Sequence, residues 1–220
     1  MKKAKFLFLL VFILLPGIIL PQSDIRFSMG LNFNSSPQLR EYLNYFAPAS
    51  DLQPEVSTYI EFAGEYGYQI NNKYQIGLEA AYESKKINYP SIASNYVFDY
   101  GLIMPSLIGY YISSAEGYKL KFGVGVGPRF AVVDESKVTN QSVGYSSTGF
   151  GILLKADGST KLSELVFAYI GFDLRYNNIS ELKSSSNVSL LNPNTNKGIS
   201  FNTFSAGIKL GVSIIFQSGD

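Results

Sequence analysis

The fold is decided most clearly by residues 204–216, which have the sequence FSAGIKLGVSIIF. The even positions, from Phe204 to Phe216, are apolar, whereas the odd positions up to Ser213 are serine, glycine or lysine. Successive side chains of a β-strand point to opposite faces, so this alternation predicts a strand with one apolar face. A strand needs about 9–11 residues to cross a bilayer, whereas strands of soluble proteins average about 5–6. The length of this segment therefore favours a membrane strand.

The same alternation recurs along the chain, in residues 25–34, 58–70, 74–84, 96–112, 118–132, 146–156 and 164–176. Three of the joints between these segments are short, at 71–73, 113–117 and 157–163. The other four connections between the segments are longer and polar, at 35–57, 85–95, 133–145 and 177–203. Outer-membrane barrels have this alternation of short periplasmic turns and longer extracellular loops. We therefore predict an all-β fold, a closed antiparallel transmembrane β-barrel of eight strands.

The apolar set of each segment is expected to face lipid. In residues 96–112 this set is Tyr96, Phe98, Tyr100, Leu102, Met104, Ile108, Tyr110 and Ile112. Aromatic residues gather at the two ends of the apolar faces, where membrane interfaces favour them. Pro105 and Pro128 lie inside predicted strands and remove ladder donors, so bulges or local bends are expected there.

The N-terminus has the features of a secretory signal. Residues 1–5 are basic, and an unbroken apolar run follows at 6–20, which is short for a membrane-spanning helix. We predict a signal peptide at 1–22 and a single barrel domain at 23–220. An uncleaved anchor helix is the alternative. Export of a barrel predicts location in the outer membrane, with the lipid bilayer and the barrel-assembly machinery as partners.

Composition excludes several classes of function. The chain has no cysteine and no histidine, and its formal net charge is +1. We expect no nucleic-acid partner, no metal site and no cofactor. An enzyme is not expected either, because histidine is the usual general base at neutral pH. Catalysis by carboxylates alone is disfavoured, since the acidic residues alternate with small ones on a wall that faces basic residues.

The polar set of each strand is expected to face the lumen. The candidates for ion pairs there are Glu61, Glu65, Glu79, Glu83, Asp99, Arg129, Asp173, Arg175 and Lys209. We predict that Arg129 pairs with Asp99, and that Lys209 meets Glu65 or Glu79. Such pairs would form a structural plug, because an eight-stranded barrel has an interior that side chains fill. The alternative is a narrow ion-conducting path.

Residues 99–111 and 122–130 resemble the PorT-like family of outer-membrane β-barrels, small barrels of the OmpA type. The family shows an aromatic-x-x-hydrophobic-Pro strand, followed by a glycine-rich strand that ends in Gly-Pro. Residues 172–179 are similar to its penultimate strand. Two features depart from the pattern: Met104 stands where the family often has an acidic residue, and four residues follow Phe216. The resemblance implies the fold and the location, and no defined activity.

Two roles remain open for such a barrel. One is recognition of an extracellular ligand or protein through loops 35–57 and 177–203, and the other is a structural role in the membrane. A soluble lipocalin-like binder would need an apolar lumen, which the charged residues oppose. Leu39, Tyr42, Leu43 and Phe46 have helical spacing and predict a small surface helix within the first loop.

Overall fold

A computed structural model describes residues 23–91, 94–137 and 142–216. The predicted signal peptide lies outside the described residues. The elements are β1 (Ser23–Ser35), α2 (Pro37–Phe46), β2 (Ser57–Asn71), β3 (Tyr74–Ser91), β4 (Ser94–Ala115), β5 (Tyr118–Ser136), β6 (Ser142–Lys161), β7 (Val166–Ile179), β8 (Lys183–Ser184) and β9 (Thr203–Phe216). Among the described helices, none has the length and apolarity that a membrane crossing requires.

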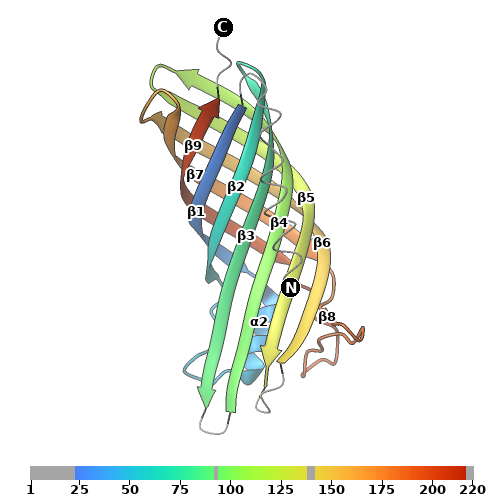
Figure 1. The fold of residues 1–220 in the computed structure, drawn as a ribbon. Helices are drawn as coiled ribbons and strands as arrows, with labels where there is room; N and C mark the ends of the chain where they lie inside the picture. The colour runs from blue at the N-terminus through green and yellow to red at the C-terminus, as the bar shows by residue number, and fades with distance from the viewer. Residues whose placement is uncertain (1–22, 92–93, 138–141, 217–220) are drawn as a thin grey trace.

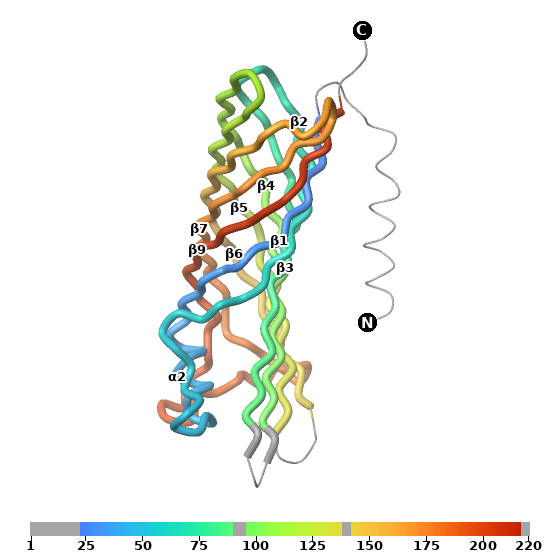
Figure 2. Tube along the Cα trace, turned by 90° about the vertical axis from the view of Figure 1, so that its left-hand side faces the viewer, coloured from blue at the N-terminus to red at the C-terminus, as the bar shows by residue number. Residues whose placement is uncertain are grey.

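The eight long strands close into one antiparallel barrel (Figures 1 and 2). β1 pairs with β2 on one side and with β9 on the other, and β5 pairs with β6. Ser23 is the register partner of Phe216, so the described chain enters and leaves at the same end of the barrel. The prediction of a closed eight-stranded barrel is confirmed.

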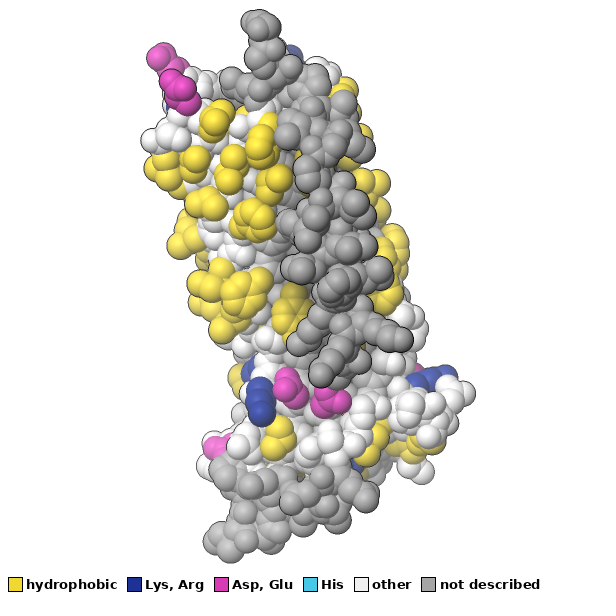
Figure 3. Space-filling view, in the orientation of Figure 1, with side chains coloured by type: hydrophobic (Ala, Val, Ile, Leu, Met, Phe, Trp, Pro, Cys, Tyr) yellow, Lys and Arg dark blue, Asp and Glu magenta, His cyan; other side chains and the backbone are white. Residues whose placement is uncertain are grey.

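Alternation along each strand separates a lipid face from a lumen face. On β9, Leu210 is 66% exposed whereas its neighbour Lys209 is 2% exposed. On the face that Figure 3 shows, apolar side chains form a band over the middle of the barrel, and charged side chains lie beyond both ends of it. Exposed aromatic residues lie near both ends of the band: Phe27, Tyr68, Tyr74, Tyr111 and Tyr118 at one, and Phe33, Tyr82, Phe130, Tyr176 and Phe204 at the other. These are the lipid-facing exterior and the interfacial rings of a membrane barrel.

β4 has the opposite orientation to the one predicted. Its set from Tyr96 to Ile112 is buried inside the barrel, with Phe98, Leu102 and Met104 fully inaccessible. The lipid face is instead formed by the other set, which includes Ile103, Leu107 and Tyr111. Both faces of β4 are rich in apolar residues because one contacts lipid and the other packs in an internal apolar core. Alternation alone therefore could not assign them.

Two of the predicted long loops are strands. β3 continues to Ser91 and β4 begins at Ser94. The two strands pair with each other as far as Ser91 and Ser94. β5 and β6 continue in the same way to the pair of Ser136 with Ser142. Figure 2 shows these strands extending past the rest of the barrel on one side. We call residues 85–91, 94–100, 131–136 and 142–148 the extracellular sheet.

The two strand prolines interrupt the ladder without shifting its register. β4 and β5 pair from Val97 to Ile103 and again from Leu107 to Ala115, with the same offset on both sides. Pro105 and Pro128 fall opposite each other within the gap. Of the two features predicted here, the bulge is wrong and the local bend stays a prediction. Two residues without an N–H group share one gap, which leaves the rest of the ladder intact.

The predicted surface helix is present, with one face exposed at Tyr45 and the opposite face buried. α2 buries Leu39, Tyr42 and Leu43 against the inner face of the extracellular sheet. Residues 179–201 contribute Leu182, Leu190, Ile199 and Phe201 to the same core. We call α2, residues 179–201 and the extracellular sheet together the extracellular head.

Candidate functional site: the ion-paired lumen and the extracellular head

The middle of the lumen holds a continuous network of ion pairs. Arg175 contacts Glu61 at 3.0 Å, Glu79 at 2.9 Å and Asp173 at 2.8 Å. Lys209 contacts Glu61 and Asp173. All five side chains are at most 2% exposed. Charges buried this deeply are stable when each has close partners of opposite sign.

The network continues toward the periplasmic end. Lys155 bridges Glu79 at 2.7 Å and Glu65 at 2.8 Å. Arg26 reaches Glu65 at 3.4 Å and Asp157 at 2.7 Å, and its guanidinium lies 3.9 Å from the ring centroid of Tyr169. Side chains from opposite walls therefore meet across the lumen.

A separate pair closes the periplasmic end of the lumen. Lys121 contacts Asp24 at 2.7 Å, and the side-chain amide of Gln75 donates to the same carboxylate at 2.9 Å. These three residues come from β5, β1 and β3, so they also span the interior.

Toward the extracellular end, neutral groups replace basic ones. Glu83 accepts hydrogen bonds from the side-chain amides of Asn32 at 3.0 Å and Asn34 at 2.5 Å, and from the Tyr100 hydroxyl at 3.4 Å. The network thus ends where the apolar core of the head begins.

Arg129 is bound by neutral acceptors. Its Nε–H donates to the side-chain oxygen of Asn177 at 2.6 Å, and its Nη1 donates to the carbonyls of Pro105 at 3.0 Å and Pro128 at 2.9 Å. Gly127 lies beside this contact, where a Cβ would collide with the Pro105 carbonyl. The guanidinium therefore binds carbonyls inside the ladder gap that the two prolines leave.

Of the candidates predicted for the lumen, all except Asp99 are buried there. The predicted pair of Asp99 with Arg129 is wrong, because the inverted face of β4 places Asp99 outside. Its register partners on the outer face are Lys86 and Asp134. The predicted partner of Lys209 is also wrong, since Lys209 contacts Glu61 and Asp173 in place of Glu65 or Glu79.

Sequence reasoning missed three buried acids: Asp24, Asp157 and Glu135. Each lay just outside a predicted strand or in a predicted joint. Yet Asp157 has the same parity as Lys155 on β6, and Glu135 has the same parity as Lys121 and Arg129 on β5. Continuing the alternation past the predicted strand ends would have found them.

Aromatic contacts hold the extracellular head together. The Tyr100 and Phe201 ring centroids are 4.5 Å apart, and Phe46 of α2 stacks on Tyr96 at 4.8 Å. Both the backbone N–H and the hydroxyl of Ser200 donate to the Gln38 side-chain oxygen at 2.9 Å, which links residues 179–201 to α2. The head is therefore a packed unit rather than a set of independent loops.

A buried carboxylate fixes α2 to the extracellular sheet. The hydroxyls of Tyr42 and Tyr96 both donate to Glu135, the latter at 2.9 Å, while Lys137 lies 3.4 Å from the other carboxylate oxygen. Burial, followed by the contact with Glu135, raises the pKa of the Tyr42 hydroxyl well above its usual range. Tyr42 therefore remains a hydrogen-bond donor at physiological pH.

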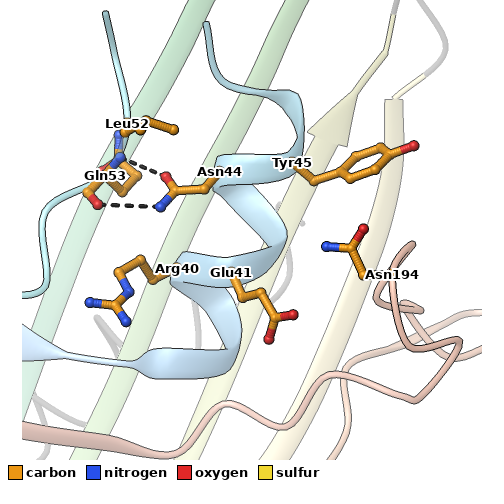
Figure 4. A pocket seen from close by; sticks show the side chains of 7 residues that line it. All are labelled: Arg40, Glu41, Asn44, Tyr45, Leu52, Gln53 and Asn194. Carbon is orange, nitrogen blue, oxygen red and sulfur yellow. Dashed lines mark hydrogen bonds between the residues drawn. The ribbon is translucent and has the colours of Figure 1, made fainter. Parts of the chain in front are cut away.

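An open cleft of about 430 Å³ lies on the outer surface of the head. It is lined by Arg40, Glu41, Asn44, Tyr45, Leu52, Gln53 and Asn194 (Figure 4). The Asn44 amide is bonded to the Gln53 backbone, which fixes that side of the cleft. Tyr45 and Leu52 are 55% and 54% exposed, so the cleft presents apolar groups beside charged ones.

No family model matches the chain, and no curated protein matches it in sequence. Solved structures resemble it in fold. Neisserial surface protein A has a TM-score of 0.54 at 14% identity, over 88% of this chain and 97% of that one. A major outer membrane protein from Thermus thermophilus has a TM-score of 0.54 at 11% identity, over 88% and 99%. The attachment invasion locus protein Ail of Yersinia pestis has a TM-score of 0.50 at 13% identity, over 89% of this chain and 99% of that one.

These matches agree with the geometry of the chain itself. A closed antiparallel ladder leaves no unpaired edge within the hydrocarbon, and the exterior of the barrel is an apolar band bounded by aromatic residues. The chain is an eight-stranded transmembrane β-barrel protein of the outer membrane.

Proposed function

We propose that this protein is a closed barrel that presents a rigid extracellular head for recognition of a partner at the cell surface. The observation that carries this proposal is the apolar core of the head, which includes Tyr42, Phe98 and Phe201. A segment that merely joins strands needs no core of its own. A preordered surface, by contrast, loses less conformational entropy on binding.

The lumen supports a closed, non-catalytic barrel. Within its described part, each buried carboxylate is engaged by a basic residue, an amide or a tyrosine hydroxyl. The head covers the extracellular end with apolar side chains. This arrangement favours the ion-paired plug over a conducting path. Membership of the PorT-like family is part of the proposal, and it rests on residues 99–111 and 122–130.

Site-specific photo-crosslinking in intact outer membranes tests the recognition role. A photoreactive residue at Tyr45 or Leu52, beside the cleft, is expected to give a discrete adduct with a partner of the cell surface. The matched control is Leu210, which faces lipid. Adducts from the head that are absent at Leu210 support recognition. If the head positions give nothing beyond the Leu210 pattern, the recognition role is rejected in favour of a structural one.

Planar-bilayer recording tests the closed lumen independently. The protein is expected to give no steady conductance, because side chains span the interior at several levels. A large, stable conductance from the unmodified protein would show that the charged residues line an open path, and the plug would have to be abandoned.

A further inference from the structure

The two edges of the extracellular sheet differ. On the β6 edge, β8 adds a short strand, with Tyr145 paired to Ser184 and Ser146 to Lys183. On the other edge, β3 pairs with β2 as far as Ser84, whereas its pairing with β4 continues to Ser91. Residues 85–91 of β3 thus have a strand partner on one side. The chain adds a strand to one edge of this sheet and, within 23–91, 94–137 and 142–216, adds none to the other, where Gln53 contacts the side chains of Lys85 and Tyr89 but no strand pairs with residues 85–91.

The backbone groups that face the open edge follow from the ladder. The N–H of Ile112 donates to the carbonyl of Lys73 at 2.8 Å, next to the pair of Tyr74 with Tyr111. In an antiparallel ladder, this bond means that odd-numbered residues of β3 share their backbone groups with β4 and even-numbered ones face away. The N–H and carbonyl groups of Lys86 and Asn88 therefore point to the open edge. Among the described residues, neither pair of groups has a hydrogen-bond partner.

We propose that this edge binds an extended segment of a partner protein as an added strand. A row of unpaired N–H and carbonyl groups is a template for another strand, and such pairing is a recurring mode of peptide recognition. Pro90 lacks an N–H group, so the available stretch is short, which limits non-specific pairing. This inference rests on the proposed recognition role and names the class of partner.

Charge selects the kind of segment. Lys86 is exposed on the outer face, and its register partner on β4 is Asp99. An added strand with an acidic residue opposite Lys86 would place the lysine between two carboxylates. Cross-strand pairs of opposite charge are favourable, and like charges directly opposite are not. We therefore infer a partner segment with acidic and β-branched residues in alternation.

A second copy of the chain fits this edge poorly. Barrels in one membrane all direct β3 the same way, so two β3 edges could meet only in parallel, with Lys86 of one copy near Lys86 of the other. Like charges would then oppose the contact. A strand from a different protein has no such constraint.

The test uses an acetylated and amidated heptapeptide in which valine and glutamate alternate. We expect saturable binding to the purified protein in nanodiscs, measured by fluorescence anisotropy. The same peptide with alternate amides N-methylated should bind at least about tenfold more weakly, because it cannot pair along the edge. Equal binding of the two peptides, or no saturable binding of the first, would overturn the inference.

Two variants at one position separate backbone pairing from side-chain contact. Asn88→Pro removes an N–H that faces the open edge and takes no part in the β3–β4 ladder, so the barrel should fold and keep its heat-modifiable mobility. Its affinity for the peptide should fall at least about tenfold, whereas Asn88→Ala should bind as the unmodified protein does. Unchanged binding by Asn88→Pro contradicts the proposal.

Two further outcomes would correct the inference. Self-association that Asn88→Pro abolishes would identify the occupant as a second copy and overturn the proposed partner. Failure of the peptide to bind, together with head-specific adducts at Tyr45 or Leu52, would reject the edge while the recognition role stands. If the peptide does not bind and the head positions give no specific adducts, both the strand-edge site and the recognition role are rejected.

Discussion

Pro105 and Pro128 face each other across β4 and β5, and the guanidinium of Arg129 donates to the carbonyl oxygens of both. Neither proline has an N–H group to offer its neighbour, so each would leave carbonyls of the ladder without a donor. A planar guanidinium with several donors in a fixed geometry meets this need from within the lumen. Arg129 thus takes part in the backbone pairing of the sheet.

The substitution Arg129→Met should destabilise the barrel through the loss of these donors. We expect about 1–3 kcal/mol for each buried acceptor that is left unpaired, measured as a shift in the urea midpoint of unfolding in lipid. Arg129→Lys keeps the charge but not the fork geometry and should recover little of the loss. Full stability of the lysine variant would show that charge, not carbonyl binding, is the role of this residue.

The substitution Lys209→Met should cost about 3–5 kcal/mol, because Glu61 and Asp173 would remain buried with one cation fewer. Adding Glu61→Gln should recover part of the loss by removing an uncompensated charge. The matched control is Glu65→Gln, which removes a carboxylate bound by Lys155 and Arg26. Equal rescue by the two glutamine substitutions would argue against the partners described for Lys209.

The orientation of β4 predicts a small change in stability for a substitution at Asp99 and a large loss for one at Leu107. Asp99→Asn should change stability by less than about 0.5 kcal/mol, because the carboxylate is on the outer surface opposite Asp134. Leu107→Arg, on the lipid face, should cost about 2–4 kcal/mol if its position is near mid-membrane. Both values come from the same unfolding assay. A large loss for Asp99→Asn, near that of a broken buried pair, would restore the lumen orientation.

The contact between Tyr42 and Glu135 should control the local stability of α2. Tyr42→Phe removes one donor to a buried carboxylate, and we expect faster hydrogen exchange of the amides of residues 38–46. The matched control is Tyr45→Phe, which alters an exposed ring on the same helix. If the two variants exchange alike, the Glu135 contact does not hold the helix in place.

Alternation in the sequence was sufficient to predict the barrel, its closure and most of its two faces. Strands with one charged and one apolar face, such as β9 and β5, left no ambiguity, because burying the wrong face would place charges in lipid. β4 was different, since Tyr100 and Leu107 are equally suited to an apolar core and to a bilayer. Only the three-dimensional structure shows that the core of the head lies on one side of this strand.

The lumen was predictable in content but not in pairing. Which residues face inward follows from parity, so Glu61, Arg175 and Lys209 could be identified. Which of them meet depends on the relative stagger of strands around the barrel, and that stagger is not encoded in any single strand. The loops were predicted least well, because Ile87, Tyr89 and Val133 continue strands through segments that contain many polar residues.

The composite core of the head has a consequence for the order of assembly. Phe201 lies just before β9 in the chain, whereas its ring partner Tyr100 lies on β4. The helix α2 lies between β1 and β2 in the sequence. The core of the head therefore contains residues from near both ends of the chain and from its middle. It can be complete only when the last strand, β9, has paired with the first, β1. A chain arrested before that step would expose Phe98 and Tyr100 to water at the cell surface. A complete head is therefore a structural mark of a closed barrel, because its core forms only when the first and last strands are both in place.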